Sequence, residues 1–259
     1  MKLGLQLARD QRTQKMSPHY GTDFTVDSLF GANIWRKLAV FDPTIFGDKM
    51  NPTVSTATPI SDPGPRKREG FFQEALKTLG DVAQQGALAT NAEEAVQVVT
   101  LALANLLGDR EAHLCLGNLK AGEFQQFACG AFFLTADGRS NLLIAPINYH
   151  PEQKHMKVDA TLGHPGWMVK NQKPLLLANT DLDSGFVKIL RTFRAGSVCY
   201  APIKLGDTYY GQIICAAQGR NTMTQDDLVV HTAFCQLAAA LWVSKSGPEY
   251  LKKIDGETA

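Results

Sequence analysis

The chain has 259 residues, of which 44% are apolar and 20% charged, and its formal net charge is +1. This length accommodates one large domain, or one domain with an appendage, and the composition is that of an ordinary globular protein. The charge balance excludes a global field that would attract nucleic acid or an anionic membrane, and no apolar run approaches the ~18 residues that span a bilayer.

Residues 1–69 are predicted to form an N-terminal arm that ends in a proline-rich linker over 51–69. The chain begins with no continuous hydrophobic region and no cleavage site, so we expect no secretory signal. The aromatic residues of this arm have a spacing that fits neither an amphipathic helix nor a regular strand, and they are too apolar for an ordinary disordered tail. The candidate partner-binding residues of the arm are Phe24, Phe30, Trp35, Phe41 and Phe46.

Two alternatives remain open for the arm. It either folds back on the core of its own chain, or it lies across a partner with each aromatic side chain in a pocket. The basic triplet Arg66-Lys67-Arg68 at the end of the linker is expected to be solvated.

Two helices are predicted where the regular part of the sequence begins. Apolar residues at helical spacing indicate the first over 71–85. The second is predicted over 92–107, because Asn91 is a suitable N-cap and Gly108 a suitable C-terminal stop. Since the second helix is nearly all apolar, we expect it to be buried or paired. The apolar stripe of the first helix consists of Phe72, Leu76, Leu79 and Val82/Ala83.

The middle of the chain is predicted to be a series of short strands. Apolar runs over 113–116, 127–134 and 141–147 have the length of strands, and Asp137-Gly138 is a hairpin signal between the last two. Residues 149–162 are polar, and we expect a loop or a weak strand there.

The next segment alternates helix and strand signals. A short helix is predicted over 166–171 and a strand over 174–178. Residues 183–193 are predicted to be helical because their apolar side chains align at helical spacing. A β-hairpin follows, with strands over 197–204 and 209–217.

The last helix is predicted to begin at Thr224, which forms a variant capping box with Asp227. Gly247-Pro248 is expected to end it. We therefore assign residues 70–246 to the folded domain and residues 247–259 to a C-terminal tail.

The reactive residue types show no catalytic or metal-binding pattern. None of the five cysteines forms a CxxC pair or has a histidine at metal-ligand spacing. We therefore expect buried, reduced thiols, a usage that points to the cytoplasm. His150 and His155 are expected in an exposed loop, and no Ser/His/Asp set, paired acids or phosphate loop is recognisable. We predict no catalytic residue, no metal and no cofactor.

Four features of the second half of the chain carry a family resemblance. They are the turn and helix Gly163-His164-Pro165-Gly166-Trp167, the strand Ser197–Pro202, Gly211 inside the next strand, and the helix start Thr224–Leu228. Independently of any family, a glycine inside an apolar strand indicates a bulge or a close approach of two backbones. The order of these features resembles that of GAF domains. The resemblance implies an α+β fold with a central antiparallel sheet of about six strands, terminal helices on one face and a small-molecule pocket on the other.

The resemblance also implies which residues form that pocket, and it excludes some ligands. Bilin-binding relatives carry a Cys-His dipeptide, and cyclic-nucleotide-binding relatives carry an Asn-Lys pair; this chain has neither at the matching positions. The glycine-rich turn also lacks the cysteine of methionine-sulfoxide-reducing relatives. His164 would contact an anionic ligand or lie in a surface turn. The candidate pocket residues are Trp167, Phe186, Ile189, Ser197, Cys199 and Gln212.

Three functional hypotheses follow. The leading one is a non-enzymatic GAF protein that serves as an accessory, regulatory or assembly subunit, through a homodimer of its terminal helices and a protein partner held by the arm. The alternative is a small-molecule sensor with a ligand in the pocket. The third is a thiol-dependent enzyme of the methionine sulfoxide reductase kind, whose turnover would depend on Cys199 and Cys129.

Overall fold

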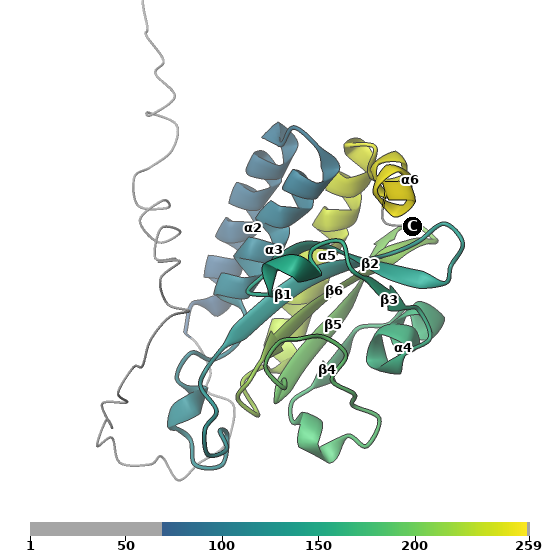
Figure 1. Ribbon diagram of the computed structural model, residues 1–259. Helices are drawn as coiled ribbons and strands as arrows, with labels where there is room; N and C mark the ends of the chain where they lie inside the picture. Colours follow the sequence, from purple (N-terminus) through teal and green to yellow (C-terminus); the bar gives the residue numbers. More distant parts are fainter. Residues whose placement is uncertain (1–68, 258–259) are drawn as a thin grey trace, which may run out of the picture. The chain divides into compact units, whose positions relative to one another are not determined.

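Six strands build one antiparallel sheet in the computed structural model, which describes residues 69–257 (Figure 1). Their order across the sheet is β3-β2-β1-β6-β5-β4, and every neighbouring pair runs antiparallel. This arrangement confirms the predicted α+β class and the six-stranded sheet. The strands are β1 Phe127–Leu134, β2 Ser140–Ile147, β3 Lys157–Asp159, β4 Leu175–Leu177, β5 Ser197–Leu205 and β6 Thr208–Ala217.

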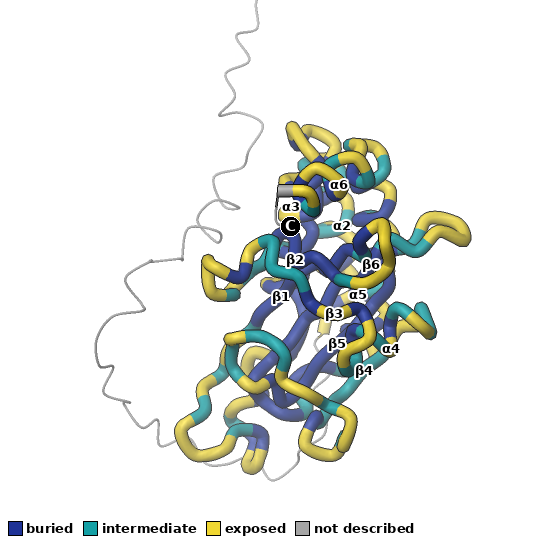
Figure 2. Tube along the Cα trace, turned by 45° about the vertical axis from the view of Figure 1, so that its right-hand side comes forward, coloured by how far each residue is buried: buried dark blue, intermediate teal, exposed yellow. Residues whose placement is uncertain are grey.

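The long helices cover one face of the sheet, and a short helix lies on the other (Figure 1). Between them, β1, β2, β5 and β6 are buried along most of their length, whereas the loops at the ends of the sheet are exposed (Figure 2). The helix-covered face carries α2 Phe71–Leu88, α3 Ala92–Leu106, α5 Gln225–Ser244 and α6 Gly247–Glu257, and the opposite face carries α4 Gly163–Asn171.

The helix ends follow their predicted capping residues. The Asn91 side chain accepts a hydrogen bond of 2.9 Å from the backbone N–H of Glu94, which caps α3. Thr224 and Asp227 form a reciprocal capping box at the start of α5. Local sequence therefore fixes where these two core helices begin.

The glycines of the resemblance lie where backbones approach each other. A Cβ added at Gly211 in β6 would clash with the carbonyl oxygen of Phe132 in β1. A Cβ added at Gly166 would clash with the backbone of Thr161, at the entry to α4. Gly211 confirms the expected close approach of two backbones, and Gly166 lies in a similarly crowded position.

The core of the helix-covered face is dense. The rings of Phe133 in β1 and Trp242 in α5 stack with centroids 3.8 Å apart, and Leu241 of α5 packs against Gly86 of α2. Within residues 69–257, α5 alone has the length and hydropathy to cross a membrane, and 56% of that window is buried inside the domain, as in a core helix.

Two predicted elements are wrong. Residues 113–116 do not form a strand; Ala112–Leu114 is a 3-10 turn, held because the Asn118 side chain donates to the Ala112 carbonyl at 2.9 Å. Residues 183–193 are irregular rather than helical. There the Asp183 side chain accepts from the N–H of Gly185 at 2.8 Å, a local turn that competes with helix formation.

The predicted C-terminal tail also differs, because α6 extends over most of it. Gly247-Pro248 ends α5 but also starts α6, since proline is tolerated in the first turn of a helix. Leu251 and Ile254 of α6 are buried in the core. In α2, the stripe that identified the helix is partly exposed, and the residues that face the core are Phe71, Ala75, Val82 and Gly86.

Candidate functional site

A cavity of about 80 Å³ lies on the sheet face opposite the long helices. Strand residues form its floor, and the irregular segment 186–195 covers it, together with Tyr149 and Pro165. The floor residues are Phe132, Val198, Tyr200, Ile214 and Ala216.

Two of the six candidate pocket residues, Phe186 and Ile189, line this cavity. They do so from an extended cover rather than from the helix that the sequence predicts. Trp167 is 39% exposed on α4 and is not among the lining residues. The structure therefore brings the two cover residues to the cavity and leaves Trp167 at the surface.

Ser197 and Cys199 lie on the other face of the sheet. Side chains alternate along β5, so Val198 and Tyr200 face the cavity while Ser197 and Cys199 face the helices. The Ser197 hydroxyl accepts from the N–H of Met223 at 3.1 Å, next to the start of α5. Both residues therefore belong to the helix-facing core.

Gln212 is a buried anchor rather than a cavity-lining residue. Its Nε2 donates to the Pro165 carbonyl in α4 at 3.1 Å. Its Oε1 is buried and has no hydrogen-bond partner within the described residues. Gln212 thus holds α4 on the sheet.

The sequence missed two tyrosines that line the cavity, Tyr149 and Tyr200. Burial raises the pKa of both phenols, so they stay protonated at neutral pH and can donate one hydrogen bond each. Strand β5 is apolar at nearly every position, so alternation did not mark Tyr200. Tyr149 lies in a loop with no such signal.

His164 joins α4 to the cavity cover. Its Nε2 lies 3.3 Å from an Asp183 oxygen, and its ring stacks on Tyr200 with centroids 5.7 Å apart. The side chain is only 12% exposed, and its Nδ1 is buried with no partner among residues 69–257. It is therefore neither an exposed turn residue nor a residue at an open anion site.

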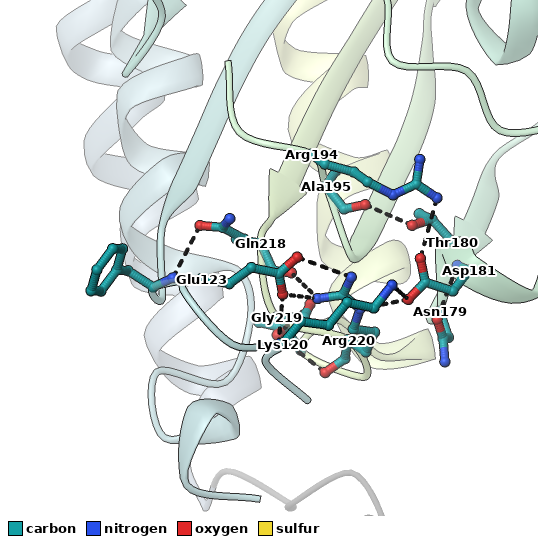
Figure 3. A network of polar contacts seen from close by, with 12 residues as sticks. Lys120, Glu123, Asn179, Thr180, Asp181, Arg194, Ala195, Gln218, Gly219 and Arg220 are labelled. Atoms are coloured by element: carbon teal, nitrogen blue, oxygen red, sulfur yellow. Dashed lines mark hydrogen bonds and ion pairs between the residues drawn. The ribbon is translucent and has the colours of Figure 1, made fainter. Parts of the chain in front are cut away.

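A buried arginine anchors one end of the cover (Figure 3). Arg220, which follows β6, is 2% exposed and forms a bidentate ion pair with Glu123. Its Nε donates to Asp181 at 2.9 Å. Asp181 also pairs with Lys120 at 2.8 Å and with Arg194 at 3.2 Å. This network ties the loop before β1 to both ends of the cavity cover.

The network also sets the ionisation of its acids. Hydrogen bonds from Lys120, Arg220 and Arg194 hold the pKa of Asp181 far below its usual value. For Glu123, burial opposes ionisation, but the contacts with Arg220 outweigh it and the pKa is lowered. Both carboxylates therefore stay charged through the neutral range.

All five cysteines are buried and none is in a disulfide, as the sequence predicts. None lines the cavity, and four belong to the core on the helix-covered face, namely Cys129, Cys199, Cys215 and Cys235. Burial raises the pKa of Cys199, Cys215 and Cys235.

Within residues 69–257, no group of three or more potential ligands could hold a metal ion. The cavity offers apolar contacts and the hydroxyl groups of Tyr149 and Tyr200.

The candidate arm residues Phe24, Phe30, Trp35, Phe41 and Phe46 lie outside the described part of the chain. Their role in partner binding stays a prediction.

No protein-family model and no curated protein matches the sequence. Solved structures do match. The GAF domain of an Acinetobacter phosphoenolpyruvate-protein phosphotransferase has a TM-score of 0.54 and 11% identity, over 67% of this chain and 95% of that one. The GAF domain of the Coxiella burnetii phosphotransferase has a TM-score of 0.53 and 19% identity, over 70% and 97%. A free methionine-R-sulfoxide reductase from Neisseria meningitidis, in complex with its substrate, has a TM-score of 0.50 and 10% identity, over 70% and 95%.

These likenesses define a class of fold: an antiparallel sheet with long helices on one face and a small cavity on the other. The described part of the chain has the fold of a GAF domain. Because the matched structures include GAF domains of phosphotransferases and a methionine sulfoxide reductase, the fold alone does not decide the function.

Proposed function

We propose that this chain is a non-enzymatic GAF protein that acts as an accessory or regulatory subunit through contacts of its helix layer. The observation that carries this proposal is an exposed apolar ridge on α2. Phe72 is 52% exposed and Leu76 is 71% exposed, and the half-buried Leu79 and Ala83 continue the same helical stripe. The neighbouring stripe of α2, formed by Phe71, Ala75, Val82 and Gly86, is packed on the core, and Leu79 also contacts that core. A helix whose apolar surface extends beyond its core-facing stripe is typical of one that packs against a second protein surface.

The occupant that we propose for this ridge is the α2 helix of a second copy. A Phe72→Glu/Leu76→Glu variant of the full chain places two charges in such an interface, and it should convert a dimer into a monomer in sedimentation or light-scattering measurements. Lys77→Glu/Gln84→Glu is the matched control, because both residues are exposed on the polar side of the same helix. A monomeric wild type, or a variant with unchanged size, would remove the dimer from the proposal.

The arm has a separate role in this proposal, as the anchor for a different protein. Replacing Phe24, Trp35 and Phe41 together by serine in the full chain should abolish recovery of a partner in native pulldown while dimer size stays unchanged. Equal recovery with the serine variant would exclude the aromatic residues as anchors.

Ligand sensing is the second candidate function. It is favoured by the cavity and by the polar contacts that hold its cover, namely His164–Asp183 and the Arg220 network. A small, mostly apolar ligand would contact Val198, Phe186 and Ile189 and accept hydrogen bonds from the two tyrosines. Native mass spectrometry of protein purified gently from its host should find a retained mass. Val198→Phe should lose that mass, because the larger side chain fills the cavity floor. The control Val229→Phe, on the exposed side of α5, should retain it. A wild-type mass equal to that of the protein without a ligand would exclude ligand sensing.

A sulfoxide reductase activity is the weakest of the three candidates. One matched structure is a free methionine-R-sulfoxide reductase, but thiol chemistry at the cavity would need a cysteine there, and all five lie elsewhere. We expect no thiol-dependent reduction of free methionine sulfoxide. Turnover that Cys199→Ser or Cys129→Ser abolishes would overturn the non-enzymatic assignment.

A further inference from the structure

Three cysteines form a row across the centre of the sheet. Cys129 in β1 lies directly opposite Cys215 in β6, and Cys215 lies directly opposite Cys199 in β5. All three side chains face the long helices. The Sγ atoms of Cys129 and Cys215 are 3.0 Å apart. His231 of helix α5 lies next to this row, with its Nε2 3.8 Å from the Sγ of Cys215.

We propose that Cys129 and Cys215 are a redox-active dithiol, which a hydroperoxide oxidises to an intramolecular disulfide. The backbone geometry fits the bond. Directly opposed residues of antiparallel strands have Cα atoms about 4.5–5.5 Å apart, within the range of about 4.4–6.8 Å that a disulfide spans. The two sulfurs must approach by about 1 Å to reach the S–S bond length of about 2.05 Å. The sheet can therefore accept the bond without a change of strand register.

The oxidation balances with one hydroperoxide per disulfide. The sulfur of Cys215 attacks one oxygen of hydrogen peroxide, the O–O bond breaks, and the thiol proton leaves with the departing oxygen as water. The sulfur of Cys129 then attacks the resulting sulfenic acid, the S–S bond forms, and a second water leaves. Two thiols lose two electrons, and the peroxide is reduced to two waters.

The surroundings favour Cys215 as the first thiol and make the reaction slow. His231 Nε2 lies 3.8 Å from the Cys215 sulfur, and burial lowers the pKa of His231, so its imidazole is neutral. In the tautomer that carries the proton on Nδ1, Nε2 accepts the S–H proton of Cys215 and makes this sulfur the better nucleophile. Burial also raises the pKa of the Cys215 thiol, so its thiolate is scarce. Oxidation by peroxide is therefore expected over hours rather than seconds.

The third cysteine of the row provides a matched control. Cys199, like Cys129, is directly opposite Cys215 and fully buried, but among the described residues the sulfur of Cys215 has a hydrogen-bond contact with Cys129 and none with Cys199. The disulfide would join β1 to β6, the two central strands of the sheet, and close a long loop. Such a bond restricts the unfolded chain, so the oxidised protein should unfold at a temperature higher by roughly 10 °C.

The test uses the full-length reduced protein, treated with hydrogen peroxide and then quenched. Thiol titration in denaturant should fall from five thiols to three, because one disulfide consumes two. Peptide mapping without reductant should find Cys129 joined to Cys215, and dithiothreitol should restore the reduced protein. Cys199→Ala should behave like the wild type, whereas Cys129→Ala should form no disulfide.

The wild-type peptide map decides the proposal even where a variant does not fold. A map that joins Cys129 to Cys215 supports it. Five remaining thiols, a Cys199–Cys215 bond, an intermolecular bond, or a sulfinic acid at Cys215 in place of the disulfide would each overturn it.

Discussion

The two faces of the sheet are held in different ways. On the helix-covered face, apolar side chains of α2, α3, α5 and α6 pack against the sheet, and this core includes the Phe133–Trp242 stack. On the opposite face, α4 and the segment 183–195 pack on a smaller apolar cluster that includes Met168, and they are also fastened by separate polar contacts. These contacts are His164–Asp183, Gln212–Pro165 and the Arg220 network.

This difference separates stability from binding within one domain. Apolar burial is cooperative and non-directional, so the helix-covered face is expected to supply most of the free energy of folding. A polar contact contributes little net energy when it forms, although removing one partner of a buried ion pair is costly. We therefore expect the cover of the cavity to open at a lower free-energy cost than unfolding of the sheet.

The largest expected effect compares one phenylalanine from each face. Phe133→Ala removes a fully buried ring from the stack with Trp242 and should cost roughly 3–5 kcal/mol in free energy of unfolding. Phe186→Ala removes a half-buried ring of the cavity cover and should cost about 1 kcal/mol. Chemical denaturation measures both. Equal losses would contradict the division between the two faces.

The next effect concerns the Arg220 ion-pair network, which anchors the cover of the cavity. Arg220→Met keeps the volume but leaves two carboxylates without their buried partner, which should cost roughly 2–4 kcal/mol. It should also speed hydrogen exchange in residues 183–195 more than in the strands. Arg191→Met, which breaks an exposed pair with Glu152, is the control and should change stability by less than about 1 kcal/mol. Faster hydrogen exchange in β1 than in residues 183–195 would contradict the role of Arg220 as the anchor of the cover.

The same network predicts an acid dependence. The pKa values of Asp181 and Glu123 are lower in the folded protein than in the unfolded chain. Their stabilisation is therefore present above the unfolded pKa of about 4, and it is lost as the pH falls toward the folded pKa. Wild-type stability should decrease below about pH 4 more steeply than that of Arg220→Met. Parallel curves would show that the ion pairs do not stabilise the fold.

His231 gives a second pH effect, from the helix-covered face. Burial lowers its pKa to about 3 in the folded protein, whereas an unfolded histidine titrates near 6.5. The unfolded state therefore binds the proton first, and stability should fall by about 1 kcal/mol per pH unit between roughly pH 6 and pH 3. His231→Leu should flatten this slope in urea titrations at several pH values. Retention of the full slope would assign it to other groups.

The smallest expected effect tests the local cap of α5. Thr224→Ala removes the hydroxyl that pairs with Asp227 and should cost about 1 kcal/mol. Thermal unfolding measures the loss, and Thr208→Ala at an exposed strand position is a control with little effect. A loss as large as that of Phe133→Ala would mean that the cap supports the tertiary core.

Local signals in the sequence determined most of the elements. The caps at Asn91 and Thr224, the hairpin turns and the apolar run lengths depend on neighbouring residues only, and the helices and strands begin close to where these signals place them. The order of these elements was enough to indicate the GAF fold. Local signals failed at 183–193, where helical spacing was present but Asp183 and Gly185 favour a turn.

Only the tertiary structure decided which side chains face the cavity. Strand β5 is buried on both faces, so its sequence has no alternation that distinguishes Cys199 from Tyr200. The helix layer covers one face and α4 the other, which sends Cys199 to the core and Tyr200 to the cavity. The contact between Cys129 and Cys215 arises in the same way, because strand register joins residues that are far apart along the chain.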